Sequence, residues 1–107
     1  MFLPMPVVSE LAFGAYEHER KNNGSRRYHE TLAAALSLFD GNILPFRMEA
    51  AMKFGEISAL RNGMGRPIMR LDAMIAAICL VHGATLATRN VRDFDGLGLK
   101  LVNPFEA

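Results

Sequence analysis

The sequence has a single cysteine, no tryptophan and almost no net charge, and these absences remove whole classes of protein. Its 107 residues carry 12 Lys and Arg against 11 Asp and Glu, a formal net charge of +1. One cysteine excludes an intramolecular disulfide and a Cys-rich zinc site, and Cys79 falls on an apolar helix face where an inert, buried thiol is expected. A charge near zero gives no global basic field to attract nucleic acid. A reducing cytoplasm is the expected location.

Long hydrophobic runs are also lacking, so no segment is expected to span a membrane. The start, MFLPMP, has neither the basic residues nor the long apolar stretch of a targeting signal. A small α/β phosphatase or nucleotide-binding domain is an alternative on pattern alone, although no Gly-rich phosphate loop is present. What is present is half hydrophobic and 21% charged, as in an ordinary globular protein. We expect a single domain over residues 1–107 with one core.

The basic residues are unevenly spread, which leaves room for local basic rims. One group is expected in an early loop and the other around a later one: Arg20, Lys21, Arg26 and Arg27, then Arg61, Arg66 and Arg70.

Hydrophobic spacing predicts helices that alternate with short apolar strands. Helices are expected over 7–20, 26–39, 47–61 and 71–82, and strands over 42–46, 84–88 and 99–102. Pro6 fits the first turn of the first helix, and Gly83 fits the left-handed stop of the last. This alternation favours an α/β fold with a parallel sheet and helices on both faces. The strand over 84–88 is expected to be buried on both faces.

Two carboxylates, Asp72 and Asp93, mark the two ends of one helix–strand unit. Asp72 lies in the first turn of the predicted helix over 71–82, and Asp93 lies just beyond the strand over 84–88. Because sites in open α/β sheets gather at the carboxyl ends of the strands, the two side chains can come close together. Paired hard oxygen ligands suit Mg²⁺ or Mn²⁺. A structural explanation competes, since a first-turn acid also stabilises a helix dipole and an acid in a loop is readily solvated.

Glu10, Thr88 and Asn90 are further candidates. Glu10 stands in an apolar stretch, where a carboxylate is costly unless a cation or hydrogen-bond donors meet it, and this favours a functional role. Thr88 and Asn90 flank the end of the strand over 84–88 and could orient a water or an acid, although turn chemistry explains Asn90 equally well. The histidines lack the spacing of a zinc site and are assigned no chemistry.

Three segments, in this order, resemble the motifs of PIN domains of the VapC toxin type: SELAFGAY, LDAMIAA and TRNVRDF. The closing LGLKLVNPF resembles the usual tail of these proteins. The resemblance covers nearly the whole chain and implies a three-layer α/β/α fold with a parallel sheet. It implies a Mg²⁺- or Mn²⁺-dependent endoribonuclease, the toxin of a type II toxin–antitoxin pair, together with a VapB-type antitoxin and a homodimer. It also implies that Glu10, Asp72 and Asp93 form the acidic metal site. Asp95 has no clear counterpart in the family and is a weaker fourth candidate.

For such an activity, Thr88 or Asn90 would position the attacking water, and Arg89 or Arg92 would contact a phosphate of the RNA. One departure from the family matters here. Family members begin with a strand that ends in an Asp-Thr-Asn-like motif, followed by a helix, and neither is present in this sequence. We therefore expect that the first strand–helix unit is missing and that metal binding and activity are weakened.

Two alternatives to a working nuclease stay open. One is a catalytically inactive PIN-like module that binds an antitoxin or dimerises. The other is an incomplete chain that pairs its exposed sheet edge with another chain.

Overall fold

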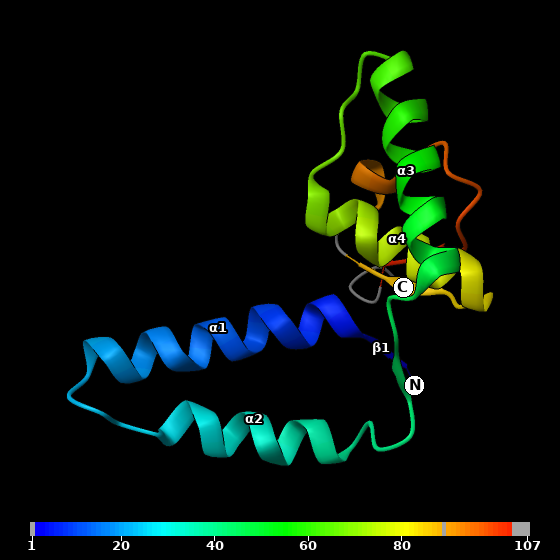
Figure 1. Cartoon of the computed structure of the whole chain (residues 1–107). Coiled ribbons are helices and arrows are strands. Elements are labelled where there is room, and N and C mark those ends of the chain that lie inside the picture. Colours follow the sequence, from blue (N-terminus) through cyan, green and yellow to red (C-terminus); the bar gives the residue numbers. More distant parts are fainter. Residues whose placement is uncertain (1, 89, 104–107) are drawn as a thin grey trace. The chain divides into compact units, whose positions relative to one another are not determined.

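The structure is a computed structural model that describes residues 2–88 and 90–103 (Figure 1). The elements, in chain order, are β1 (Leu3–Pro4), α1 (Met5–Lys21), α2 (Arg27–Ser37), β2 (Ile43–Leu44), α3 (Met48–Gly63), α4 (Arg70–His82), β3 (Leu86–Ala87), the 3-10 helix η1 (Val91–Phe94) and β4 (Leu101–Val102). The α/β class is confirmed, and the four predicted helices are present within a few residues of their expected bounds. The chain divides into two compact units, Met1–Leu44 and Pro45–Ala107. A single domain over residues 1–107 stays a prediction.

The first unit is a helical hairpin inserted between two paired strands. Strand β1 pairs in parallel with β2, with Leu3 opposite Ile43 and Pro4 opposite Leu44. Helices α1 and α2 lie side by side in Figure 1, joined by the loop that precedes α2. Pro6 is buried in the first turn of α1, as predicted, because backbone N–H groups there need no intrahelical partner.

Acidic side chains at the loop end of this hairpin neutralise much of the predicted early basic rim. Glu17 Oε1 lies 2.6 Å from Arg20 Nε. Glu19 lies 3.3 Å from Arg26 Nη1 and 2.8 Å from His29 Nε2, so it links α1 to the start of α2. Ion pairs therefore offset part of the positive charge at this end of the hairpin.

The second unit is built around α4. Ala73, Ala76, Ala77 and Ile78 of this helix have no exposed surface, and α4 packs against α3, which buries Ala50 and Ile57. Cys79 is 3% exposed, and burial raises the pKa of its thiol, as expected for an inert cysteine. Small alanine side chains allow close approach of the two helices, and this packing makes α4 a rigid platform.

The end of α4 leads into a second parallel strand pair. Gly83 ends the helix with φ 63°, in the predicted left-handed conformation. Leu86 of β3 then lies opposite Leu101 of β4. The prediction that the strand over 84–88 is buried on both faces is wrong, because Leu86 is half-buried and Ala87 is exposed.

Leu86 and Ala87 keep exposed surface because the sheets are small. The described strands form two separate pairs, so β3 has a single strand neighbour in the described chain. None of the described helices is both long enough and apolar enough to cross a bilayer.

Candidate functional site

Asp72 and Asp93 influence each other electrostatically in the second unit. Asp72 lies in the first turn of α4 and is half-buried, whereas Asp93 lies in η1 and is exposed. Partial burial, and to a lesser extent the negative charge of Asp93, raise the pKa of Asp72 above its ordinary value of 3.8. These two predicted site residues are therefore near enough for the charge of one to influence the other.

The environment of Asp72 disfavours its charged form. Partial burial comes first among the causes of the raised pKa, and the negative charge of Asp93 comes second. Within residues 2–88 and 90–103, neither carboxylate has a hydrogen-bond or ion-pair partner. Two unpaired carboxylates that repel each other form an arrangement that a hard cation would relieve.

Two buried side chains, Phe94 and Arg61, hold the turn that carries Asp93. Phe94, the next residue, is 5% exposed and belongs to the core. Arg61 of α3 is 4% exposed, and its Nη1 donates a hydrogen bond to the backbone oxygen of Asp93 over 2.7 Å. Its Nε donates to the backbone oxygen of Arg66 over 2.8 Å.

Sequence analysis missed this role of Arg61. Arg61 is buried and adds nothing to a basic rim around this loop, whereas Arg66 and Arg70 are exposed. A signal was available: Arg61 follows the buried Ile57 by four positions and so shares its face of α3.

Thr88 and Asn90 build the turn between β3 and η1. The backbone N–H of Asn90 donates to Thr88 Oγ1 over 3.0 Å, and the N–H of Asp93 donates to the backbone oxygen of Asn90 over 3.0 Å. Thr88 is half-buried and Asn90 is exposed. These bonds are turn chemistry, and the predicted role of either side chain in positioning a water stays a prediction.

The other predicted site residues lie elsewhere or outside the described residues. Glu10 lies on α1 in the first unit and is exposed, so the apolar burial inferred from its neighbours in sequence is wrong. Arg92 and Asp95 are exposed in and just after η1. Arg89 lies outside the described residues. In the described part of the chain, no three His, Cys, Asp or Glu side chains form a group that could hold a metal ion.

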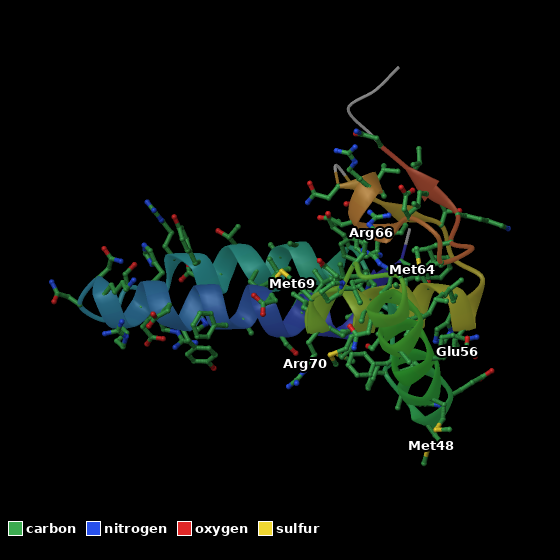
Figure 2. All side chains as sticks on the ribbon, turned by 90° about the horizontal axis from the view of Figure 1, so that it is seen from above. Met48, Glu56, Met64, Arg66, Met69 and Arg70 are labelled. Atoms are coloured by element: carbon green, nitrogen blue, oxygen red, sulfur yellow. The ribbon has the colours of Figure 1, made fainter. Side chains whose placement is uncertain are left out.

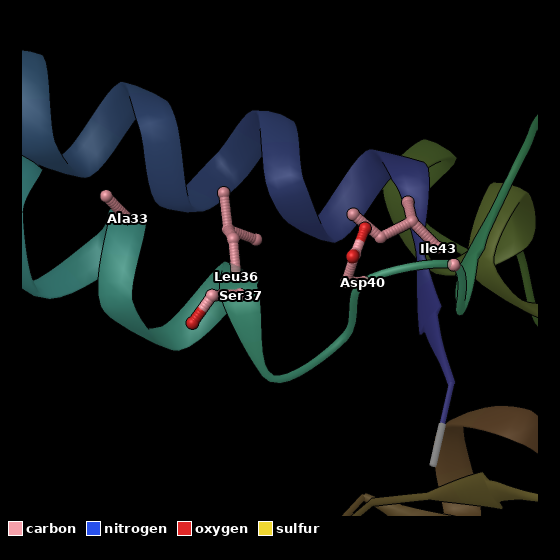
Figure 3. Close-up of a pocket in the computed structure, with 6 residues that line it drawn as sticks. Ala33, Leu36, Ser37, Asp40 and Ile43 are labelled. Atoms are coloured by element: carbon pink, nitrogen blue, oxygen red, sulfur yellow. The ribbon is translucent and has the colours of Figure 1, made fainter.

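A hollow in the first unit is a poor alternative site (Figure 3). It is lined by Ala33, Leu36, Ser37, Asp40, Gly41 and Ile43. Asp40 is its one ionisable group, so it offers neither a carboxylate pair nor an acid–base pair.

Comparison with known proteins shows the family of this chain. The family described as PIN domain matches residues 1–98. The chain belongs to the PIN domain family. The VapC ribonuclease Y4jK of Sinorhizobium fredii is 28% identical over 106 residues, which cover 99% of this PIN domain and 76% of that protein. Toxin FitB of Neisseria gonorrhoeae is 30% identical over 108 residues, which cover 98% of this chain and 76% of the toxin.

Solved structures of FitAB and VapBC share the fold. FitAB bound to a DNA fragment matches with a TM-score of 0.80 and 28% identity, over 99% of this PIN domain and 74% of that chain. DNA-bound VapBC from Salmonella typhimurium matches with a TM-score of 0.73 and 26% identity, over 95% and 74% of the respective chains. The resemblance to VapC-type PIN domains is therefore confirmed, and this chain spans about three quarters of the length of these relatives.

Proposed function

We propose that this PIN domain is a divalent-metal-dependent endoribonuclease, the toxin of a type II toxin–antitoxin pair that acts in the cytoplasm. The observation that carries the proposal is the Asp72–Asp93 pair, in which an exposed carboxylate helps to raise the pKa of a half-buried one. The pair occurs in a chain similar to a protein named as a VapC ribonuclease.

The chemistry of the pair fits Mg²⁺ or Mn²⁺. Mg²⁺ in proteins commonly takes one or two carboxylates, keeps several waters and binds substrate phosphates at its remaining positions. Asp72 and Asp93 would hold the ion, and Glu10 is the proposed third ligand, directly or through water. When bound, the ion supplies charge neutralisation at the phosphoryl group and makes a water easier to deprotonate.

The surrounding residues have separate proposed roles. Thr88 Oγ1 accepts the N–H of Asn90, which leaves the hydroxyl proton available to a water. The Asn90 amide is the alternative water-positioning group. Arg92, exposed beside Asp93, and Arg89 would contact phosphates of the RNA, so RNA affinity should fall steeply with added salt.

The direct test is RNA cleavage by the purified chain with Mg²⁺ or Mn²⁺, with and without EDTA. We expect EDTA to abolish cleavage, and Asp72→Asn and Asp93→Asn each to reduce it by about 100-fold or more, because each removes a carboxylate that would hold the ion. Glu49→Gln is the matched control, since Glu49 is an exposed acid in the first turn of α3. Cleavage that resists EDTA, or that survives both substitutions at the Asp pair, would contradict the proposal.

A second candidate function is a non-catalytic module that binds a VapB-type antitoxin and forms a homodimer. Its support is that the similar solved structures are FitAB and VapBC complexes. A folded parent chain that cuts no RNA, yet has twice the monomer mass of 11.8 kDa in light scattering, would favour this candidate. A folded monomer with metal-dependent cleavage would contradict it.

A further inference from the structure

Arg61 is a buried cation whose charge has no acidic partner in the described chain. Only 4% of the surface of Arg61 is exposed. No carboxylate of residues 2–88 or 90–103 lies within ion-pair distance of its guanidinium. Burying an unpaired charge is costly unless hydrogen bonds compensate it. The compensation here comes from backbone carbonyl groups.

The guanidinium spans two backbone segments that are far apart in sequence. Nη1 reaches the oxygen of Asp93, 32 residues away, over 2.7 Å, and Nε reaches the oxygen of Arg66, five residues away, over 2.8 Å. Arg66 completes the link, because its Nη2 donates to the backbone oxygen of Arg92 over 3.1 Å. Arg61 thus ties the loop after α3 to the turn that carries Asp93.

The two segments also pack closely. Gly96 follows η1 with φ +77°, and an added Cβ there would lie 3.3 Å from Met64 Cε. Figure 2 shows Met64 and Arg66 in the loop that follows α3. The loop and the turn therefore contact each other, and the buried Arg61 guanidinium binds the backbone of both.

The turn needs such an anchor because it is short. Helix η1 has four residues and no side-chain cap. The buried Phe94 side chain and the bond from Arg66 to the Arg92 oxygen hold the residues on either side of Asp93. The bond from Arg61 holds the backbone of Asp93 itself.

We propose that Arg61 is a positioning residue that holds Asp93 beside Asp72, so that both carboxylates are preorganised to share a divalent cation. The inference rests on the proposed function for its purpose, whereas the structural effect on the turn stands by itself. Arginine suits the role because its planar fork reaches two carbonyl groups at once. A lysine carries all its donors on one nitrogen atom and lacks this planar fork.

The first test is amide hydrogen exchange in the metal-free full chain. The N–H groups of Asp93 and Asp95, which donate within the turn, serve as reporters, and amides of α4 serve as the internal reference. Arg61→Met keeps the apolar stem of the side chain, and Arg61→Lys keeps the charge but not the fork. We expect both variants to exchange these two amides about 10-fold faster relative to α4, because stability differs locally across a structure.

Ile57→Ala is the matched control, because Ile57 is 3% exposed and lies one turn earlier on the same face of α3. It should accelerate amide exchange throughout the second unit and leave the ratio of turn to α4 exchange unchanged. An unchanged ratio of turn to α4 exchange in Arg61→Lys, or the same pattern in Ile57→Ala, would overturn the proposal. Arg61→Lys preserves size and charge, which keeps the test usable where Arg61→Met unfolds.

The second test is calorimetric titration with Mn²⁺ at a temperature where every variant is folded. We expect Arg61→Met to weaken Mn²⁺ binding by about 10-fold or more, as is usual when a group that orients a metal ligand is lost. Arg61→Lys should give an intermediate loss, and Ile57→Ala a change below about 2-fold. Parent-like affinity in Arg61→Met would overturn the positioning role. A parent chain that binds no Mn²⁺ would instead overturn the proposed function, while hydrogen exchange still decides whether Arg61 holds the turn.

Discussion

At the scale of single residues, Asp72 reduces the stability of the metal-free protein. Burial and Asp93 raise its pKa above 3.8, so the folded state holds the proton more strongly than the unfolded state does. The resulting contribution to stability is fully present below the unfolded pKa and is lost as the pH rises through the folded pKa. At neutral pH the folded protein therefore carries an unfavourable ionised group, as is common where function requires a strained site.

Replacing Asp72 with a neutral isostere should stabilise the metal-free chain. We expect Asp72→Asn to raise the melting temperature at pH 7 in EDTA. The advantage should shrink as the pH falls through the raised pKa of folded Asp72, and disappear below the ordinary value of 3.8, where the carboxyl group is protonated in both states. Thermal unfolding followed by circular dichroism across this pH range measures the difference. A variant that is less stable than the parent at pH 7 would show that Asp72 stabilises the fold.

At the scale of elements, α4 is the platform on which the site depends, and its end is set by Gly83. With φ 63°, Gly83 adopts a conformation that costs an L-residue about 1 kcal/mol or more. The buried alanines of α4 then fix its position against α3. A change at Gly83 should therefore weaken the second unit without touching either carboxylate.

Gly83→Ala should lower the free energy of unfolding by about 1 kcal/mol, because alanine disfavours the left-handed region. Gly55→Ala is a control of opposite sign. Gly55 lies inside α3, with no atom within 4 Å of an added Cβ, so alanine there should stabilise the helix by about 0.5 to 1 kcal/mol. Urea denaturation measures both changes. Equal effects of the two substitutions would show that backbone conformation at Gly83 does not limit stability.

At the scale of the whole molecule, the proposed cation couples the site to folding. A ligand that binds the folded state alone stabilises it by about 2.7 kcal/mol at a concentration 100 times its dissociation constant. Mn²⁺ at such a concentration should raise the melting temperature of the parent by about 10 °C or more, given about 4 to 8 °C per kcal/mol for a small domain. The binding energy thus offsets the repulsion between Asp72 and Asp93.

Differential scanning calorimetry with Mn²⁺ and then with excess EDTA measures this shift. Asp72→Asn and Asp93→Asn should lose most of it, whereas Glu49→Gln should keep it. An equal Mn²⁺ shift in all four proteins would show that the ion acts away from the pair.

What the sequence by itself determined was local. The bounds of the helices, the stop at Gly83 and the burial of Cys79 follow from periodicity and backbone preference, which act over a few residues. The two acids were found from their places at a helix start and beyond a strand end. The three motifs that resemble those of PIN domains are likewise short stretches of sequence.

Tertiary structure alone decided what depends on residues far apart in the chain. The raised pKa of Asp72 requires the fold to cover its side chain and, to a lesser extent, to bring Asp93 near it. The hydrogen bond from Arg61 to the Asp93 carbonyl requires the Asp93 turn to meet α3. The exposure of Glu10 and Ala87 differs from expectation, because an apolar neighbour in sequence does not supply a covering neighbour in space. Burial and charge interactions depend on packing between segments, and packing is fixed by the fold rather than by any short stretch of residues.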